Sequence, residues 1–475
     1  MSKGKRNGKG SAPAAPAPVA PSPRIALALA GVALVLGMIA ATVQPWDPRD
    51  TTQVSRTPPD ESAHLLYVRD LITEWRLPVL ETGAGNYEAH QPPLYYLSCV
   101  PAALVSRAVS GGGTEKLLST TEVMALRAWS VLIFAGVVVA CYLIGTAVFP
   151  MSKWLPVATA GFAMLLPGHI INVAAVTNDG LAELFCCLTI WLAIRIVRDP
   201  ASSWSRYATL GALIGGGLLT KTLCLFLLPV GVAAVLLGQW PQPGEPPRWG
   251  QRLSRAGVVV GVALGVWAPW IAHNLAHYPG DPLVAKTFLR IFGEDRLTPD
   301  IFLFTIGPLG YLRVLTAWTF ASFWGVFGQA KVFMADAYYV VGGALALATC
   351  GGLVRCRREW NDLAAPEKRV WSVLALAAIL VGLQFLQFNK AFFQAQARYL
   401  FPAIGPIACL FVVGLSRLSG AASGQWPKRL ILGGIAVVAG MLLLALVECA
   451  SGQPPRGEPL WVVDWAEIRR LAGVG

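Results

Sequence analysis

The chain has 475 residues, of which 55% are hydrophobic and only 13% are charged, and its mean hydropathy is +0.56. Charged residues are about half as frequent as in soluble domains, which excludes an ordinary soluble enzyme or binding domain. Several apolar runs reach the roughly 20 residues that a helix needs to cross a bilayer. The sequence therefore predicts an all-α polytopic membrane protein. Its net charge of +12 is attributed to basic loops facing the cytoplasm, and nucleic-acid binding is not expected.

Residues 1–24 are basic and then rich in Ala and Pro, so we expect a disordered cytoplasmic tail. The apolar run 25–43 is longer than a typical signal-peptide core and predicts an uncleaved signal anchor with its N-terminus inside. The nine cysteines fall mostly in apolar runs without C-x-x-C spacing, which indicates core residues and neither disulfides nor zinc ligands. Further spans, about eleven in all, are expected at 126–149, 154–176, 180–197, 207–220, 222–238, 256–275, 337–354, 370–388, 399–416 and 430–447.

The segment 91–109 decides the topology. Its apolar part covers only about 12 residues and contains Pro101, which is more typical of an interfacial helix than of a crossing. If the segment does not cross, the inside segments carry 20 basic and five acidic residues, as the positive-inside rule requires. Within the membrane domain, 25–448, residues 44–125 and 276–336 then form two large outer loops. Residues 449–475 form a short outer tail.

The first outer loop contains the stretch "TPPDESAHLLYVRDLITEW", residues 57–75. Helical spacing of its apolar residues predicts an amphipathic helix along the outer interface. Asp60 and Glu61 stand at the start of this helix, and His64 follows one turn on. Asp60 has two interpretations, because Asp is a preferred N-cap residue and is also suited to chemistry in an outward-facing cleft. The apolar residues at helical spacing are Leu65, Val68, Ile72 and Trp75.

A second polar cluster follows in "YEAHQPPLYY", which places Glu88, His90 and Gln91 directly before the segment 91–109. The two prolines suit the start of a helix. Two polar clusters, each leading into an interfacial helix, indicate a cleft that opens on the outer face.

These motifs resemble a known group of proteins. "PPDESAH", "YEAHQPPLYY" and the arginine in "ALRAWSVL" are similar to motifs of the GT-C superfamily of membrane glycosyltransferases. The closest groups are the protein O-mannosyltransferases and the lipid A aminoarabinose transferases. "SFWGVFG" (322–328) and "ARYLFP" (397–402) also resemble an uncharacterised bacterial family of predicted membrane proteins. The likeness covers roughly residues 25–416. It implies a GT-C-like fold that moves a sugar from a polyprenyl phosphate to an acceptor on the outer face.

The resemblance also implies roles for individual residues. Asp60 matches the first-loop acid and would take the proton of the acceptor, while Glu61 would orient the acceptor. Asp179, in "VTNDGLAE", matches the second-loop acid, although a turn at Asn-Asp-Gly explains it equally well. Lys221 matches the lysine of a "TKG"-like hairpin, although Thr222 replaces the glycine.

A lipid phosphate as leaving group calls for cations at the outer ends of the spans. Arg127, Lys221 and Arg398 occupy such positions, and snorkelling toward lipid headgroups is the alternative for each of them. Some relatives bind a metal or the acceptor near the second polar cluster. The resemblance therefore allows a divalent metal as a cofactor, and no residues are assigned as its ligands. The residues expected to contact the acceptor, or to support those that do, are His64, Glu88, His90 and Gln91.

Two alternatives stay open. A transporter or lipid flippase is also polytopic, but usually carries polar residues near the bilayer midplane in repeated halves, which this sequence lacks. A non-catalytic member of the same fold would keep the acids as helix caps. The expected location is the plasma (inner) membrane. The expected partners are a polyprenyl-phosphate-linked sugar, the bilayer, and an acceptor that is a lipid, a glycan or a protein.

Overall fold

A computed structural model gives the structure of the chain. It describes residues 19–46, 57–83, 86–110, 118–199, 203–238, 249–293, 297–357, 359–418, 425–451, 456 and 458–472. Most of the disordered tail expected at residues 1–24 lies outside these ranges.

The described part of the chain is built from helices, with a single short β-hairpin. The hairpin pairs β1 (Val326–Phe327) with β2 (Val332–Phe333) in antiparallel fashion. Three 3₁₀ helices are η2 (Tyr87–His90), η3 (Thr222–Phe226) and η4 (Ala397–Ala403). The α-helices are α1 (Pro23–Val43), α2 (Glu61–Glu74), α3 (Leu94–Ser110), α4 (Thr120–Val148), α5 (Leu155–Leu165), α6 (Pro167–Val173), α7 (Asp179–Arg198), α8 (Trp204–Thr220), α9 (Leu227–Gly238), α10 (Trp249–His277), α11 (Ala285–Phe292), α12 (Asp300–Gly325), α13 (Asp336–Cys356), α14 (Ala365–Ala391), α15 (Ile404–Arg417), α16 (Trp426–Ala450) and α17 (Trp465–Ala472).

Nine helices in the described ranges are long and apolar enough to cross a bilayer, or ten if α5 and α6, bent by 65°, form one span. The prediction of an all-α polytopic membrane protein is therefore confirmed. The spans expected at 207–220 and 222–238 are shorter helices, α8 and η3 with α9. The outer loop expected at 276–336 contains α12, which is long and apolar but has no continuous helical backbone. Its pattern is interrupted by Gly307, whose φ is 70°, and by Pro308.

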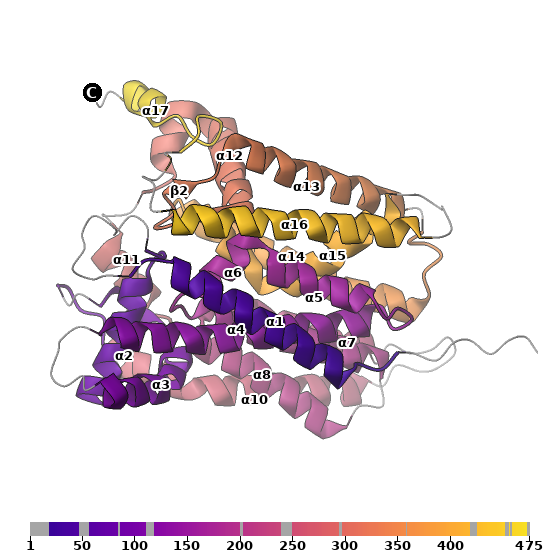
Figure 1. Ribbon diagram of the computed structural model, residues 1–475. Helices are drawn as coiled ribbons and strands as arrows, with labels where there is room; N and C mark the ends of the chain where they lie inside the picture. The colour runs from indigo at the N-terminus through magenta and orange to yellow at the C-terminus, as the bar shows by residue number, and fades with distance from the viewer. Residues whose placement is uncertain are drawn as a thin grey trace, which may run out of the picture.

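The long helices form one bundle, and the segments of the first outer loop gather at one of its ends (Figure 1). α2, α3, α11 and α17 all lie at the end where α1 finishes. Among the described spans, α4 is 72% buried over its apolar window, α7 and the span formed by η4 and α15 are each 67% buried, and α12 and α13 reach only 22%. The peripheral helices therefore present apolar surface outward, as lipid-facing helices do.

The first outer segment has an apolar core of its own. Leu65, Val68 and Ile72, expected to form the apolar face of an interfacial helix, are instead buried in an apolar cluster with residues of α3 and α4. Trp75 differs from the prediction, because it is 71% exposed and ends α2 with a left-handed backbone. α3 is 17 residues long and is not among the helices that are long and apolar enough to cross, so 91–109 remains a predicted non-crossing segment.

Candidate active site

Asp60 occupies the N-cap position of α2 without acting as a cap. Its backbone is left-handed, with φ 61° and ψ −3°, and its side chain makes no capping hydrogen bond. Asp tolerates this conformation better than most residues, though it still costs stability. The carboxylate instead accepts a hydrogen bond from Arg398 Nη2 at 2.5 Å. The geometry therefore does not support the interpretation of Asp60 as a simple helix cap.

Arg398 lies on η4, immediately before Tyr399. Its side chain is 11% exposed, and its guanidinium carbon is 5.2 Å from the centre of the Tyr399 ring. Nη2 also donates to the Tyr399 hydroxyl at 3.4 Å. The Nε–H is buried and has no hydrogen-bond partner among the described residues. Arg398 thus keeps one donor for a group that the protein itself does not supply.

A second carboxylate–cation pair lies beside the first. Asp179 opens α7, and its Oδ1 accepts a hydrogen bond from Lys221 Nζ at the end of α8. Asn172 Nδ2 donates to the other oxygen of Asp179 at 3.2 Å. Lys221 Nζ also lies 5.7 Å from the centre of the Tyr399 ring. Four segments that are distant in sequence therefore bring two acids and two cations together around Tyr399.

Burial and neighbouring charges give nearby acidic and basic groups different protonation states. Burial alone would raise the pKa of Asp60, but the Arg398 guanidinium offsets it and holds that pKa below its ordinary 3.8. Burial, reinforced by the Asp60 charge, raises the pKa of Glu88 to about 8. Burial lowers the pKa of His64 to about 3. At neutral pH Asp60 is therefore ionised, while Glu88 is largely protonated and His64 is neutral.

The second polar cluster connects the first outer loop to the segment that carries Asp179. His90 Nδ1 donates to the Tyr87 carbonyl at 2.9 Å, so its Nε2 accepts from the Gln91 amide at 2.9 Å. Gln91 Oε1 in turn accepts from Asn178 Nδ2 at 3.3 Å. Glu88 Oε2 is buried and has no hydrogen-bond partner within the described ranges.

Arg127 and Glu61 differ from the expectation of donor and acceptor contacts. Arg127 is fully buried and forms two hydrogen bonds to Glu61, at 2.9 and 2.6 Å. Its Nη1 donates to the carbonyls of Ala41 and Gln44, at 2.8 and 2.7 Å. Glu61 also accepts from the Val176 backbone N–H at 2.8 Å. The pair therefore connects the end of α1 to α2 and α4. This is a structural role, because both charged groups are buried and bonded within the protein and cannot contact a substrate.

His64 is also tied to the protein. Its Nδ1 lies 2.8 Å from the Tyr96 hydroxyl, and Tyr96 stacks on Tyr67 with ring centres 3.7 Å apart. Sequence reasoning missed Tyr399 and Asn172, which both contact the charged pairs. Tyr399 directly follows Arg398 in "ARYLFP", and Asn172 is an isolated amide inside an apolar run. Those two patterns are the available sequence signals.

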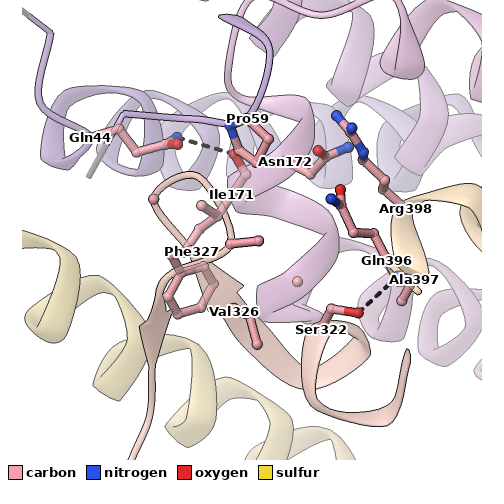
Figure 2. Close-up of a pocket in the computed structure, with 13 residues that line it drawn as sticks. Gln44, Pro59, Ile171, Asn172, Ser322, Val326, Phe327, Gln396, Ala397 and Arg398 are labelled. Atoms are coloured by element: carbon pink, nitrogen blue, oxygen red, sulfur yellow. Dashed lines mark hydrogen bonds between the residues drawn. The ribbon is translucent and has the colours of Figure 1, made fainter. Parts of the chain in front are cut away.

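Two cavities adjoin the charged pairs. A pocket of about 430 Å³ contains Asp60, Arg398 and Tyr399 in its wall. A slot of about 40 Å³ lies against α6 and also reaches Arg398 (Figure 2). The slot has room for only one or a few water-sized groups, whereas the pocket is of the size that holds small ligands. The other residues of the larger pocket are Tyr87, Phe292, Leu297, Phe392, Phe393, Gln394 and Gln396.

Metal ligands are sparse in the described ranges. These ranges contain no group of three or more His, Cys, Asp or Glu side chains arranged to hold a metal ion. Asp60 and Asp179 each already pair with a cation. A divalent ion would have to compete with Arg398 and Lys221 for these carboxylates.

Comparison with known proteins identifies the fold. No protein-family model matches the chain, and no curated protein matches it. The oligosaccharyltransferase of Archaeoglobus fulgidus, in complex with Zn and sulfate, is 15% identical with a TM-score of 0.55, over 91% of this chain and 54% of that one. The same organism's AglB, in complex with an inhibitory peptide and dolichol-phosphate, is 14% identical with a TM-score of 0.50, over 91% and 56%.

ArnT from Cupriavidus metallidurans, bound to undecaprenyl phosphate, is 16% identical with a TM-score of 0.50, over 90% of this chain and 77% of ArnT. These neighbours are GT-C glycosyltransferases, so the expected resemblance is confirmed: the chain is a multi-pass membrane protein with the GT-C fold. It spans about half the length of the oligosaccharyltransferase, at 54%.

Proposed function

We propose that this protein is a membrane glycosyltransferase that moves a sugar from a polyprenyl-phosphate donor to an acceptor on the outer face of the membrane. The observation that carries the proposal is the arrangement of the two carboxylate–cation pairs around Tyr399. They lie beside a pocket of about 430 Å³ that is large enough for a sugar. The GT-C fold of the chain supports the same reaction class.

The cations are placed to receive the phosphate of the donor. Arg398 and Lys221 are held by carboxylates from different segments, and no described residue accepts a hydrogen bond from the Arg398 Nε–H. A phosphodiester anion competes with those carboxylates for the same donors. Carboxylates and phosphates both form charge-assisted hydrogen bonds with a guanidinium, so a bound phosphate can replace Asp60 as the partner of Arg398.

Release from Arg398 prepares Asp60 to act as the base. Its carboxylate is ionised at neutral pH, and loss of the ion pair raises its affinity for a proton. In the proposed step, an acceptor hydroxyl gives its proton to Asp60 while its oxygen bonds to the anomeric carbon of the sugar. The bond from that carbon to the phosphate oxygen breaks, and the polyprenyl phosphate leaves with the electron pair. Arg398 and Lys221 stabilise the additional negative charge on the phosphate.

The large pocket suits a carbohydrate. Its wall contains aromatic rings, which can pack against the C–H faces of a sugar, and two glutamine side chains, which can both donate and accept hydrogen bonds with hydroxyl groups. Asp60 and Arg398 stand in the same wall. A sugar held there would have its phosphate linkage next to both of them.

The orientation of the site follows from the distribution of basic residues. With 91–109 not crossing, the segments assigned to the inside carry 20 basic and five acidic residues. The charged pairs lie with α2, at the end of the bundle where α1 finishes. On this basis the active site faces the periplasm or an equivalent outer compartment of the plasma membrane.

A product-release assay tests the proposal. Purified protein in lipid is incubated with a panel of polyprenyl-phosphate sugars and a cell-envelope extract that supplies lipid, glycan and protein acceptors, with and without divalent metal, and polyprenyl phosphate release is measured. We expect release from at least one donor. A protein that binds polyprenyl phosphate but releases none from the whole panel would instead support a non-catalytic member of the fold. Movement of the intact lipid across the bilayer without bond cleavage would support a flippase.

A further inference from the structure

The bent span made by α5 and α6 contains a buried histidine whose protonation can be read from its contacts. Pro167 lacks an N–H, so the carbonyl of Ala163, four residues earlier, loses its helical partner. His169 Nδ1 lies 2.7 Å from that carbonyl oxygen. A carbonyl only accepts hydrogen bonds, so Nδ1 carries a proton. His169 therefore supplies the hydrogen bond to the Ala163 carbonyl that Pro167 cannot donate.

The other ring nitrogen of His169 binds α7. Nε2 lies 2.6 Å from Glu183 Oε2, and both side chains are no more than 1% exposed. One proton lies between these two atoms, because Nδ1 already has its own. The pair is either a protonated histidine with a carboxylate or a neutral histidine with a protonated glutamate, and both are neutral overall. A neutral pair avoids the high cost of an isolated charge inside a membrane protein.

Two more contacts fix the position of α6. A Cβ atom at Gly168 would lie 2.4 Å from the Ser322 carbonyl oxygen, so only glycine allows α6 to approach α12 this closely. Gln44, just after α1, donates its amide N–H to the Ile171 carbonyl at 3.1 Å. α6 is thus held by α7, by α12 and by the end of α1.

The last polar residue of this helix faces the charged pairs. Asn172 donates to Asp179 at 3.2 Å and is only half-buried. Figure 2 shows its amide and the guanidinium of Arg398 along the same slot. An amide offers hydrogen-bond donors and an acceptor without adding charge.

We propose that Asn172 is a further binding residue for the phosphate group of the donor, and that His169 and Glu183 are positioning residues that act through it. This inference rests on the proposed function, because it assigns the phosphate to the site of Arg398 and Lys221. The amide of Asn172 holds Asp179 and is placed to donate to a phosphate oxygen beside Arg398. The buried pair fixes the helix that carries this amide.

Binding of a polyprenyl phosphate to the protein in lipid nanodiscs tests the inference without any knowledge of the acceptor. Asn172→Ala should weaken binding about ten-fold, the loss expected for one hydrogen bond of about 1.4 kcal/mol. Asn172→Asp should weaken it by roughly 100-fold, since it adds a negative charge beside the phosphate. The matched control is Thr189→Val, at a buried α7 residue whose hydroxyl lacks a hydrogen-bond partner in the described ranges.

Variants of His169 and Glu183 should show a distinct pattern of binding losses. His169→Gln should also weaken binding about ten-fold, because glutamine cannot reach both the Ala163 carbonyl and Glu183. Combining it with Asn172→Ala should cause little further loss, since both changes remove the same contact. Glu183→Gln should bind nearly as well as the wild type, because its amide N–H can donate to Nε2. Glu183→Met removes that bond and should resemble His169→Gln.

The outcomes separate this inference from the proposed function. Wild-type binding by both Asn172 variants overturns it. Additive losses in the His169→Gln, Asn172→Ala double variant overturn the positioning role. If His169→Gln does not fold, the contrast between Glu183→Gln and Glu183→Met decides that role. Wild-type binding by Arg398→Gln would instead refute the proposed phosphate site.

Discussion

Asp60→Asn should separate catalysis from folding and from donor binding. Asparagine accepts the left-handed backbone about as well as aspartate does, and no capping bond is lost because Asp60 makes none. The ion pair with Arg398 is lost, but the Asp60 side chain is 35% exposed and its amide oxygen can still accept from the guanidinium. The loss of stability should therefore be only about 1–2 kcal/mol, between the values for exposed and buried pairs.

The effects of Asp60→Asn on the two functional steps should have opposite signs. Turnover should fall by roughly 10²–10⁴-fold, because an amide cannot take the acceptor proton. Affinity for polyprenyl phosphate should rise by up to about ten-fold, because Arg398 no longer has a competing carboxylate. Release of polyprenyl phosphate measures the first step, and equilibrium binding in nanodiscs measures the second.

A matched control lies on the same helix. Asp70 likewise pairs with an arginine, Arg69, at 2.5 Å, but it is buried and has no contact with Arg398 in the described structure. Asp70→Asn should change turnover by less than about three-fold. Near-wild-type turnover in Asp60→Asn would refute the base assignment. Equal losses of turnover in both variants, together with reduced thermal stability, would indicate that Asp60 is structural.

Arg398→Gln and Lys221→Gln should each weaken polyprenyl phosphate binding by roughly 10–100-fold, whereas Arg127→Gln should mainly lower the melting temperature, because Arg127 bonds only within the protein core. Burial and the Asp60 charge raise the pKa of Glu88 from 4.5 to about 8, so the folded state binds more protons than the unfolded state between these values. The wild type therefore loses stability as pH rises through that window. Glu88→Gln lacks this titration, so its melting temperature should rise relative to that of the wild type between pH 5 and pH 8. A difference in melting temperature that does not change with pH would contradict this. A cysteine at position 112 should react with an impermeant reagent added from outside, and labelling only from inside would restore the crossing of 91–109.

The charged residues of the site can be located from the sequence because charge is rare in this chain. Asp179, Lys221 and Arg398 each stand at or near the end of an apolar run, and Asp60 stands at the start of the amphipathic stretch in the first outer loop. Their pairing cannot be read in the same way. Arg398 meets Asp60 across 338 positions, and only the packing of η4 against α6, α7 and α14 places Arg398 where it can reach Asp60.

Charge patterning also cannot distinguish a cation that faces substrate from one that holds the fold. Arg127 lies at the expected end of a span, but its partner Glu61 is 66 positions away and both are buried. At α12, hydropathy and helix-breaking residues give different indications. The segment is long and apolar enough to cross a bilayer, but Gly307 and Pro308 break its helix, so composition alone does not distinguish one crossing from two shorter outer helices.

An experimental structure of the protein in lipid with a polyprenyl phosphate bound would test the proposed phosphate site directly. We expect the phosphate within about 2.7–3.2 Å of donor atoms on both Arg398 and Lys221, with Arg398 withdrawn from Asp60 and the lipid at the end of the bundle that carries α2. A phosphate bound elsewhere, with both carboxylate–cation pairs intact, would contradict it.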